Sequence, residues 1–212
     1  MSEKKTNIGL VAYCLNQLGK PYWWGTFGQI ASESLYQQKK KQYPSYYTAN
    51  DFSSQYGAMV HDCVGLIKGY RWRNDGKLGY KPNQDVDVSG MLKLCSKQGP
   101  ISTMPDVIGA LVFMNGHVGV YIGNGEVIEA RGHAYGVAKT KLKERPWTKW
   151  GQPNWLEYEE VKMEEFKTYE EARNYLQEQN IIDSPDFWNK ANDTTKNIDK
   201  LFIKFANAYK SK

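Results

Sequence analysis

The chain has 212 residues, of which 41% are apolar, 14% aromatic and 24% charged, and its formal net charge is +5. This length fits one domain with a core of ordinary size and leaves room for a small appendage. The apolar fraction is that of a folded protein, and no stretch approaches the roughly 20 uncharged apolar residues of a membrane-spanning helix, so a disordered chain and an integral membrane protein are both excluded.

Helical spacing of apolar residues predicts a first helix from Asn7, with Thr6 or Asn7 as its N-cap and Gly19 followed by Pro21 as its stop. The apolar stretch is interrupted by polar residues and no cleavage-like pattern follows it. We therefore interpret this N-terminus as the first helix of the mature fold and not as a signal peptide. The polar and aromatic stretch that follows, at about 29–56, predicts an insertion that lies over the surface.

Two further helices are expected before residue 100. The first begins at or just after Asp62 and fades into the turn at 73–79, because apolar residues from Cys63 to Tyr70 lie on one helical face. The second covers 90–98, with Ser89 as its cap and a glycine and a proline at its end.

The periodicity then changes from helical to alternating, with Asn-Gly turns between short apolar runs, which is typical of an antiparallel meander. Helices first and strands second indicate an α+β architecture with a five- or six-stranded sheet. The expected strands are three clear ones at 110–114, 118–122 and 126–130, and two weaker ones at 137–141 and 155–159.

The last fifty residues, 161–212, have the composition of a small helical appendage, whereas 1–160 form the main domain. Thr168 with Glu171 is a capping-box pattern, and Ser184 precedes a proline suited to the first turn of a helix. An amphipathic stripe follows at Ile198, Leu201, Phe202, Phe205 and Tyr209.

The three cysteines, Cys14, Cys63 and Cys95, cannot form a closed set of disulfides, and no pair of histidines has the short spacing of a zinc site. Cys63 stands at the first turn of an expected helix, where free backbone N–H groups and the helix dipole lower the pKa of a thiol. That placement indicates a nucleophile. The alternative is that Cys63 is a small buried apolar residue.

His117 and Glu129 are the candidate partners of this cysteine. His117 heads one expected strand, and a hairpin turn around Asn124 places Glu129 of the next strand beside it. Nucleophile, base and orienting acid then follow one another in the chain as in cysteine hydrolases. Taken singly, His117 could equally be a polar residue at a strand end and Glu129 a solvent-facing one.

Together these residues carry a resemblance over about 6–158. The segments PYWWG, DCVGL, GALVFM and GHVGVYIGNGEVIEA resemble, in order, the motifs of the NlpC-type cysteine peptidases, bacterial cell-wall hydrolases with a papain-like α+β core. The resemblance implies Cys63 as nucleophile, His117 as base and Glu129 as third residue. It also implies Tyr22 near the oxyanion site, Asp62 as a possible ligand of the substrate's amine, and no metal or organic cofactor.

Three departures from the family pattern limit what the resemblance implies about this chain, above all about its substrate. Val64 replaces the usual serine after the nucleophile, Glu129 replaces a usual His, Asn or Gln, and the interval between Gly25 and Asp62 is unusually long. The implied reaction is hydrolysis of an amide bond in the peptidoglycan stem peptide, typically between D-glutamate and a diamino acid.

Two other functions stay open: a papain-like amidase or acyltransferase that uses the same site, and a non-catalytic module that binds the cell wall. The expected partner is peptidoglycan or a muropeptide, with no nucleic acid because the basic residues are scattered, no membrane span, and a monomer as the favoured state. The expected location is extracellular or in the cell wall. Because no signal peptide is visible, a phage-type lysin, a missing leader and intracellular action on imported wall fragments remain alternatives.

Overall fold

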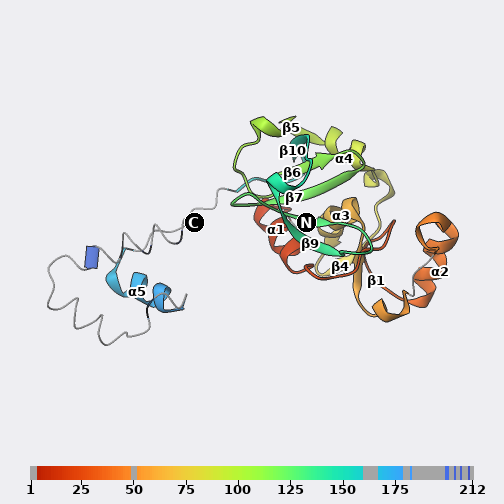
Figure 1. Cartoon of the computed structure of the whole chain (residues 1–212), viewed down its shortest axis with the longest axis horizontal. Coiled ribbons are helices and arrows are strands. Elements are labelled where there is room, and N and C mark those ends of the chain that lie inside the picture. Colours follow the sequence, from red (N-terminus) through yellow and green to blue (C-terminus); the bar gives the residue numbers. More distant parts are fainter. Residues whose placement is uncertain are drawn as a thin grey trace. The chain divides into compact units, whose positions relative to one another are not determined.

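A computed structural model of the chain describes residues 4–48, 52–159, 167–178, 182, 199–200, 203, 206 and 210 (Figure 1). The chain divides into two compact units, Met1–Glu159 and Glu160–Lys212. In the described part, no helix has the length and apolar character needed to cross a membrane.

The first unit is built on a six-stranded sheet in which every pair of neighbours is antiparallel. Four strands that follow one another in the chain form the predicted meander. Two further strands extend the sheet on the side of the first of these four. The α+β prediction is therefore confirmed. In spatial order the strands are β5 (Cys95–Pro100), β10 (Lys149–Pro153), β6 (Leu111–Met114), β7 (His117–Gly123), β8 (Glu126–Ala130) and β9 (Val137–Lys141).

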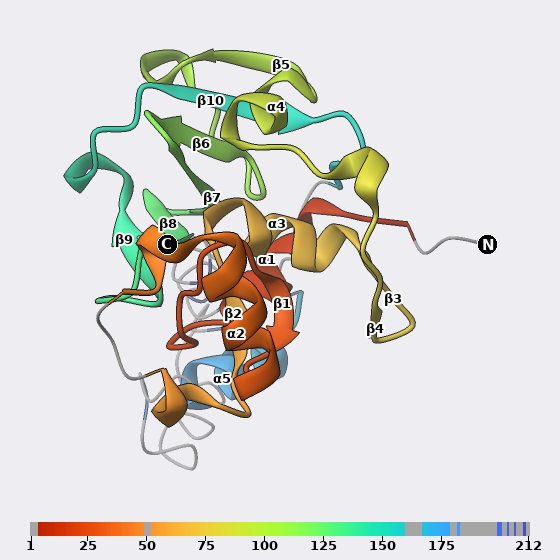
Figure 2. The ribbon, with the colours of Figure 1, turned by 90° about the vertical axis from the view of Figure 1, so that its right-hand side faces the viewer.

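Helices α1 (Asn7–Leu15) and α3 (Cys63–Arg71) pack against one face of this sheet, and both contact β7 (Figure 2). The Thr6 side chain caps α1 by accepting a hydrogen bond from the Gly9 N–H at 3.1 Å, as predicted. Alternate strand residues point to this face and form the main core with both helices: Leu10, Cys14, Leu66, Ile67, Leu111, Phe113, Val118, Val120, Ile128, Ala130 and Val137.

A smaller cluster covers the opposite face of the sheet. Val112, Tyr121 and Val127 pack there against Trp147, which follows the 3₁₀ turn Leu142–Glu144. Because strand side chains alternate, His117 lies on the same face of β7 as Tyr121.

The stretch at 29–56 differs from the predicted surface insertion because it has a core of its own. It runs between β1 (Phe27–Ile30) and β2 (Met59–His61), which pair with each other, and carries α2 (Glu33–Gln42). Trp23 is fully buried against edges of the surrounding aromatic rings, which are Tyr36, Tyr47, Phe52 and Tyr56. The aromatic residues of this stretch therefore form in part a packing cluster.

Two elements were predicted at the wrong place. The helix expected at 90–98 is α4 (Val88–Lys93), which Asp87 caps by accepting from the Gly90 N–H at 2.7 Å. Residues from Cys95 onward form β5 instead. Among the described strands it pairs with β10 alone, and a strand at the sheet edge tolerates the proline that suggested a helix stop.

The strand expected at 155–159 is also wrong. The last strand of the sheet along the chain is β10 instead. The segment that follows β10 lies beside the start of α1, where the Asn7 N–H donates to the Glu157 carbonyl at 3.0 Å. The remaining elements of this unit are a two-stranded ribbon of β3 (Arg73–Asn74) and β4 (Lys77–Leu78), and short 3₁₀ turns at Pro44–Tyr46, Ser53–Gln55, Pro82–Gln84 and Ile101–Thr103.

The second unit contains α5 (Tyr169–Glu178), whose predicted capping box is present: the Glu171 N–H donates to Thr168 Oγ1, and the Thr168 N–H donates to the Glu171 carboxylate, both at 3.2 Å. Ala172, Leu176 and Ala206 are buried in it. The predicted cap at Ser184 and the stripe from Ile198 to Tyr209 lie outside the described residues.

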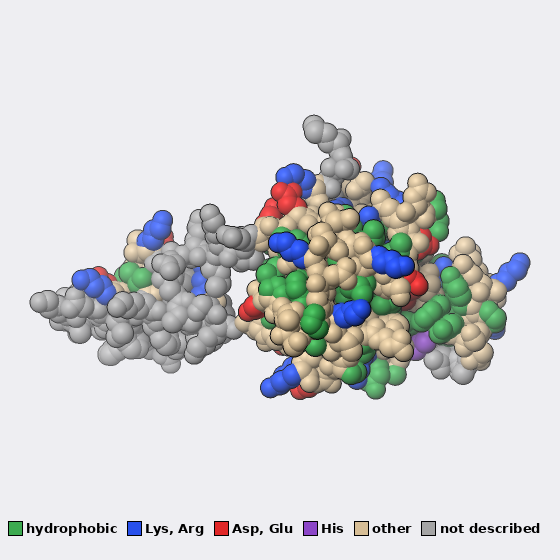
Figure 3. Space-filling view, turned by 90° about the horizontal axis from the view of Figure 1, so that it is seen from above, with side chains coloured by type: hydrophobic (Ala, Val, Ile, Leu, Met, Phe, Trp, Pro, Cys, Tyr) green, Lys and Arg blue, Asp and Glu red, His purple; other side chains and the backbone are tan. Residues whose placement is uncertain are grey.

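Basic side chains are spread over the face of the first unit that Figure 3 shows, between apolar and uncharged residues, and do not gather into one patch.

Candidate active site

Cys63 is the first residue of α3, as predicted, and Asp62 is the N-cap. The Asp62 carboxylate accepts from the Gly65 N–H at 2.5 Å and from the Gly25 N–H at 2.9 Å. A β-carbon at Gly65 would lie 1.8 Å from the Thr26 carbonyl oxygen. Glycine at this position therefore lets the helix start approach the preceding loop and holds Cys63 at the floor of a cleft.

The expected lowering of the thiol pKa is wrong for this structure. Burial, with Cys63 6% exposed, raises the pKa of the thiol to about 12, and the charge of Asp62 adds to the effect. Backbone N–H groups of Val118, Val64 and Cys63 act in the opposite direction and are outweighed. The helix start alone therefore does not lower the pKa of this thiol.

His117 and Glu129 are brought together as predicted. Nε2 of His117 lies 2.6 Å from Oε2 of Glu129, and the glutamate side chain is completely buried. With Nε2 occupied, Nδ1 is the ring nitrogen left for proton transfer, and within the described residues it makes no hydrogen bond.

Glu129 is a buried carboxylate held by three donors. Besides His117, Thr140 donates to Oε1 at 2.7 Å, and Arg145 donates through Nε to Oε1 at 3.0 Å and through Nη2 to Oε2 at 3.1 Å. Burial raises the pKa of Glu129, but the hydrogen bonds from His117, Thr140 and Arg145 outweigh it and hold the pKa below its usual value. The residue is therefore an ionised acceptor.

Trp147 fixes the plane of the imidazole. Its ring stacks on His117 with centroids 5.7 Å apart and planes 16° from parallel, and the Arg145 guanidinium lies 5.9 Å from the Trp147 ring centroid. A β-carbon at Gly119 would lie 3.1 Å from the Trp147 ring and 2.6 Å from a methyl carbon of Val127. The glycine after His117 and Val118 is thus what lets the tryptophan reach the histidine.

The structure places Cys63 near the start of β7, whose first residue is His117, without joining the two side chains. The Val118 N–H, one residue along β7 from His117, faces the Cys63 sulfur, and Gly116, one residue before His117, lines the same cleft as Cys63. Both residues are described, and no hydrogen bond joins the sulfur to the imidazole. Contacts of this kind are often long in unliganded enzymes and tighten around the substrate.

Tyr22 lies close to the nucleophile. Burial raises the pKa of its phenol, as do the nearby charges of Asp62 and Cys63, so the hydroxyl stays protonated and able to donate. His133 is packed edge-on against Tyr22 at 5.3 Å and against Phe52 at 5.2 Å between ring centroids. The structure assigns it to the aromatic cluster.

Asp62 has a structural role that the sequence did not reveal. Each of its carboxyl oxygens accepts a hydrogen bond from a backbone N–H group. Burial raises the pKa of Asp62, against the effect of these hydrogen bonds and of the Lys68 charge. Its role toward a substrate amine remains a prediction.

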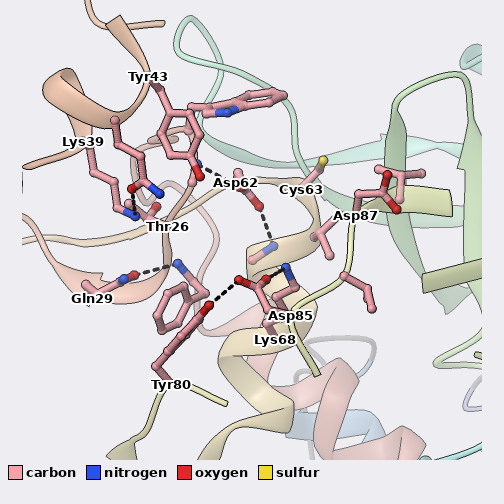
Figure 4. A pocket seen from close by; sticks show the side chains of 18 of the residues that line it. Thr26, Gln29, Lys39, Tyr43, Asp62, Cys63, Lys68, Tyr80, Asp85 and Asp87 are labelled. Atoms are coloured by element: carbon pink, nitrogen blue, oxygen red, sulfur yellow. Dashed lines mark hydrogen bonds and ion pairs between the residues drawn. The ribbon is translucent and has the colours of Figure 1, made fainter. Parts of the chain in front are cut away.

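Cys63 is one of the residues that line a cleft of about 760 Å³ (Figure 4). Its walls are the start of α3, the turn at 24–29, the end of α2 and the loop 80–88. The polar residues that line it include Gln38, Lys39, Gln42, Tyr43, Asp62, Lys68, Tyr80, Asp85 and Asp87. The long interval before Cys63 therefore supplies one wall of the cleft, and this volume is enough for a short peptide.

Sequence reasoning missed three residues of this site: Thr140, Arg145 and Trp147. Thr140 lies on a strand that was predicted, two residues beyond the partner of Glu129, so a diagonal contact was foreseeable. Arg145 and Trp147 lie in an irregular segment, and the position of such a segment cannot be predicted from sequence periodicity. Among the described residues, no group of three His, Cys, Asp or Glu side chains forms a metal site.

The sequence model of the NlpC/P60 family matches residues 19–153, more than half of the chain. No curated protein matches the chain at a significant level.

Similar solved structures include the peptidoglycan hydrolase RipB of Mycobacterium tuberculosis, with 23% identity, coverage of 72% of this chain and 67% of that one, and a TM-score of 0.41. The NlpC/p60 domain of the peptidoglycan hydrolase SagA has 16% identity, 69% and 98% coverage and a TM-score of 0.40. RipD of Mycobacterium tuberculosis, described as a non-catalytic NlpC/p60 domain protein adapted to peptidoglycan binding, has 17% identity, 71% and 98% coverage and a TM-score of 0.42.

Proposed function

Because the chain belongs to the NlpC/P60 family, we propose that it is a cysteine peptidase that hydrolyses an amide bond of peptidoglycan stem peptides, between D-glutamate and the diamino acid, at the cell wall. The observation that carries this proposal is the buried Glu129 carboxylate bonded to His117 at the strand end beside Cys63. Burying a carboxylate next to an imidazole costs free energy, so such a pair is expected where the carboxylate orients a catalytic base.

In the proposed mechanism, Nδ1 of His117 takes the proton of the Cys63 thiol as the sulfur attacks the substrate carbonyl. Glu129 holds the ring through Nε2 and stabilises the imidazolium that forms. The Cys63 N–H and the Tyr22 hydroxyl stabilise the oxyanion. His117 then gives the proton to the leaving amine, and water hydrolyses the thioester through the same base.

The ionised Glu129 supports catalysis over binding alone, because its negative charge serves an imidazolium better than a neutral ring. A non-catalytic wall-binding module, which is the described role of RipD, would need that charge only to pair with Arg145 and not to orient an imidazole. An amidase or acyltransferase would use the same residues with another acceptor.

The test is mass spectrometry of defined muropeptides after incubation with the protein, since the masses report both activity and the bond cut. We expect cleavage by the wild type, none by Cys63→Ala, and undiminished cleavage by Cys14→Ala and Cys95→Ala. Cys14 and Cys95 are buried and, unlike Cys63, do not line the cleft. Binding of muropeptides without cleavage would favour the wall-binding module, and full activity of Cys63→Ala would refute the mechanism.

A further inference from the structure

Two cations line the cleft above Cys63, and their surroundings differ. Lys68 is paired with Asp85, whose other carboxyl oxygen accepts from the Tyr80 hydroxyl at 2.8 Å. The charge of Lys68 is therefore already balanced within the protein. Lys39 is only 7% exposed and, among the residues that the structure describes, has no carboxylate within 4.0 Å.

The contacts of Lys39 are neutral. Its ammonium donates to the Gln42 side-chain oxygen at 3.3 Å and lies 5.7 Å from the centroid of the Tyr43 ring. These residues stand three and four positions further along the chain, so all three point into the cleft from one side (Figure 4). A lysine that is nine-tenths buried is normally paired, because burying an ammonium without a counter-charge costs free energy.

The neighbouring lysines of α2 serve as an internal comparison. Lys40 and Lys41 are exposed and do not line the cleft, and Lys40 lies over the Tyr36 ring at 5.4 Å. Of three consecutive lysines, only Lys39 is buried, and it is the one that faces the cleft of the nucleophile.

We propose that Lys39 is a specificity-determining residue that binds a free carboxylate of the peptide whose carbonyl lies at Cys63. The proposal rests on the proposed function for the identity of the peptide. No described carboxylate of the protein contacts the Lys39 ammonium, so the contacting carboxylate comes from the substrate, and Gln42 orients the ammonium toward it. In this proposal, Lys39 of α2 recognises the substrate, and Cys63 of α3 reacts with it.

The burial of Lys39 strengthens this reading. Burial lowers the pKa of its ammonium, although the charges of Asp62 and Asp85 act the other way. A bound carboxylate would restore the charge balance and form a charge-assisted hydrogen bond in a partly dehydrated site.

The experiment uses the peptide L-Ala-γ-D-Glu-L-Lys in three forms: with both carboxylates free, with the glutamyl carboxylate amidated, and with the C-terminal carboxylate amidated. We expect the wild type to prefer the free form to one of the amides by about tenfold or more in kcat/KM, as for other hydrogen bonds to charged groups. In Lys39→Gln that preference should vanish, chiefly through KM, while Lys40→Gln keeps it.

A second measurement separates this inference from the proposed function. Calorimetric binding of the same three peptides to Cys63→Ala, with and without Lys39→Gln, requires no catalysis. Loss of the carboxylate preference in the Lys39 variant supports the subsite even if the protein hydrolyses nothing. An unchanged preference, or none for any carboxylate in the wild type, overturns it. Lys39→Met, which keeps an apolar stem, and the melting temperature of each variant distinguish lost recognition from lost folding.

Discussion

At the scale of single residues, Cys63 lies in a setting that by itself opposes ionisation. The thiol is buried and stands next to the carboxylate that caps its helix, so its pKa is raised to about 12. The same carboxylate is indispensable to the loop, because it holds both the Gly25 and Gly65 N–H groups. Asp62 therefore fixes the start of the helix and at the same time opposes ionisation of the thiol, and in the proposed mechanism His117 supplies the activation.

This arrangement predicts the effect of Asp62→Asn. Asparagine caps helices with its one side-chain oxygen, so the bond to the Gly65 N–H should be kept while the bond to the Gly25 N–H is lost, and the negative charge that raises the thiol pKa is gone. We expect the midpoint of Cys63 alkylation against pH to move to lower pH. Iodoacetamide kinetics in a Cys14→Ala, Cys95→Ala background measure it. A midpoint that stays in place or rises would show that the Asp62 charge does not act on the thiol.

The buried Glu129 carboxylate accepts hydrogen bonds from three side chains, those of His117, Thr140 and Arg145. Glu129→Gln can still accept from His117 and should keep more activity than Glu129→Ala. It leaves the Arg145 guanidinium, 21% exposed, without its counter-charge, and we expect the free energy of unfolding to fall by about 3 kcal/mol.

The pH dependence of that loss follows from the lowered pKa of Glu129. A carboxyl whose folded pKa is depressed stabilises the fold fully above its unfolded pKa, about 4.5, and progressively less as the pH falls through its folded value. Denaturant unfolding from pH 7 to pH 3 should therefore show the wild type and Glu129→Gln converging below about pH 4.5. The double variant Glu129→Gln, Arg145→Gln should recover part of the stability at pH 7; no recovery would mean that Arg145 is not left with an unbalanced charge.

At the scale of elements, the two faces of strand β7 pack against different parts of the fold. Val118 and Val120 belong to the core with α1 and α3, while His117, Gly119 and Tyr121 face the side covered by Trp147. The glycine in the middle is a spacer, because any side chain there would meet the tryptophan that stacks on the base.

Gly119→Ala should therefore damage the site more than the fold. The added carbon would lie 2.6 Å from a Val127 methyl carbon and 3.1 Å from the Trp147 ring, and overpacking of this kind costs about 1 to 3 kcal/mol. We expect a loss of kcat greater than the loss of stability implies, because the imidazole is no longer held in its plane. Gly79→Ala, where no atom lies within 4 Å, is the matched control and should be near neutral. Equal activities of the two variants would contradict a role for the stack.

At the scale of the whole molecule, the chain forms two compact units whose division falls at Glu159 and Glu160. The last residues of the first unit belong to its core. Leu156 is buried, and the Glu157 carbonyl and Glu159 N–H bond to Asn7 at the start of α1. The family match ends at residue 153, before these contacts.

A chain ended after Glu159 should consequently fold and react with iodoacetamide at Cys63 as the full chain does, whereas a chain ended after Asn154 should be strongly destabilised. Thermal unfolding of both, beside the full chain, measures the difference. If the chain ended after Glu159 also fails to fold, the first unit requires the second.

The sequence by itself determined the helix that presents Cys63, the meander that carries His117 and Glu129, and the pairing of the last two, because each rests on local periodicity, caps and a short turn. It misplaced α4 and β10, whose identities depend on which distant strand completes the sheet. It did not reveal that Arg145 and Trp147 surround the base, that burial outweighs the helix dipole at Cys63, or that one lysine of three faces the cleft. These features are set by desolvation and by contacts between segments far apart in the chain, and no local pattern records either.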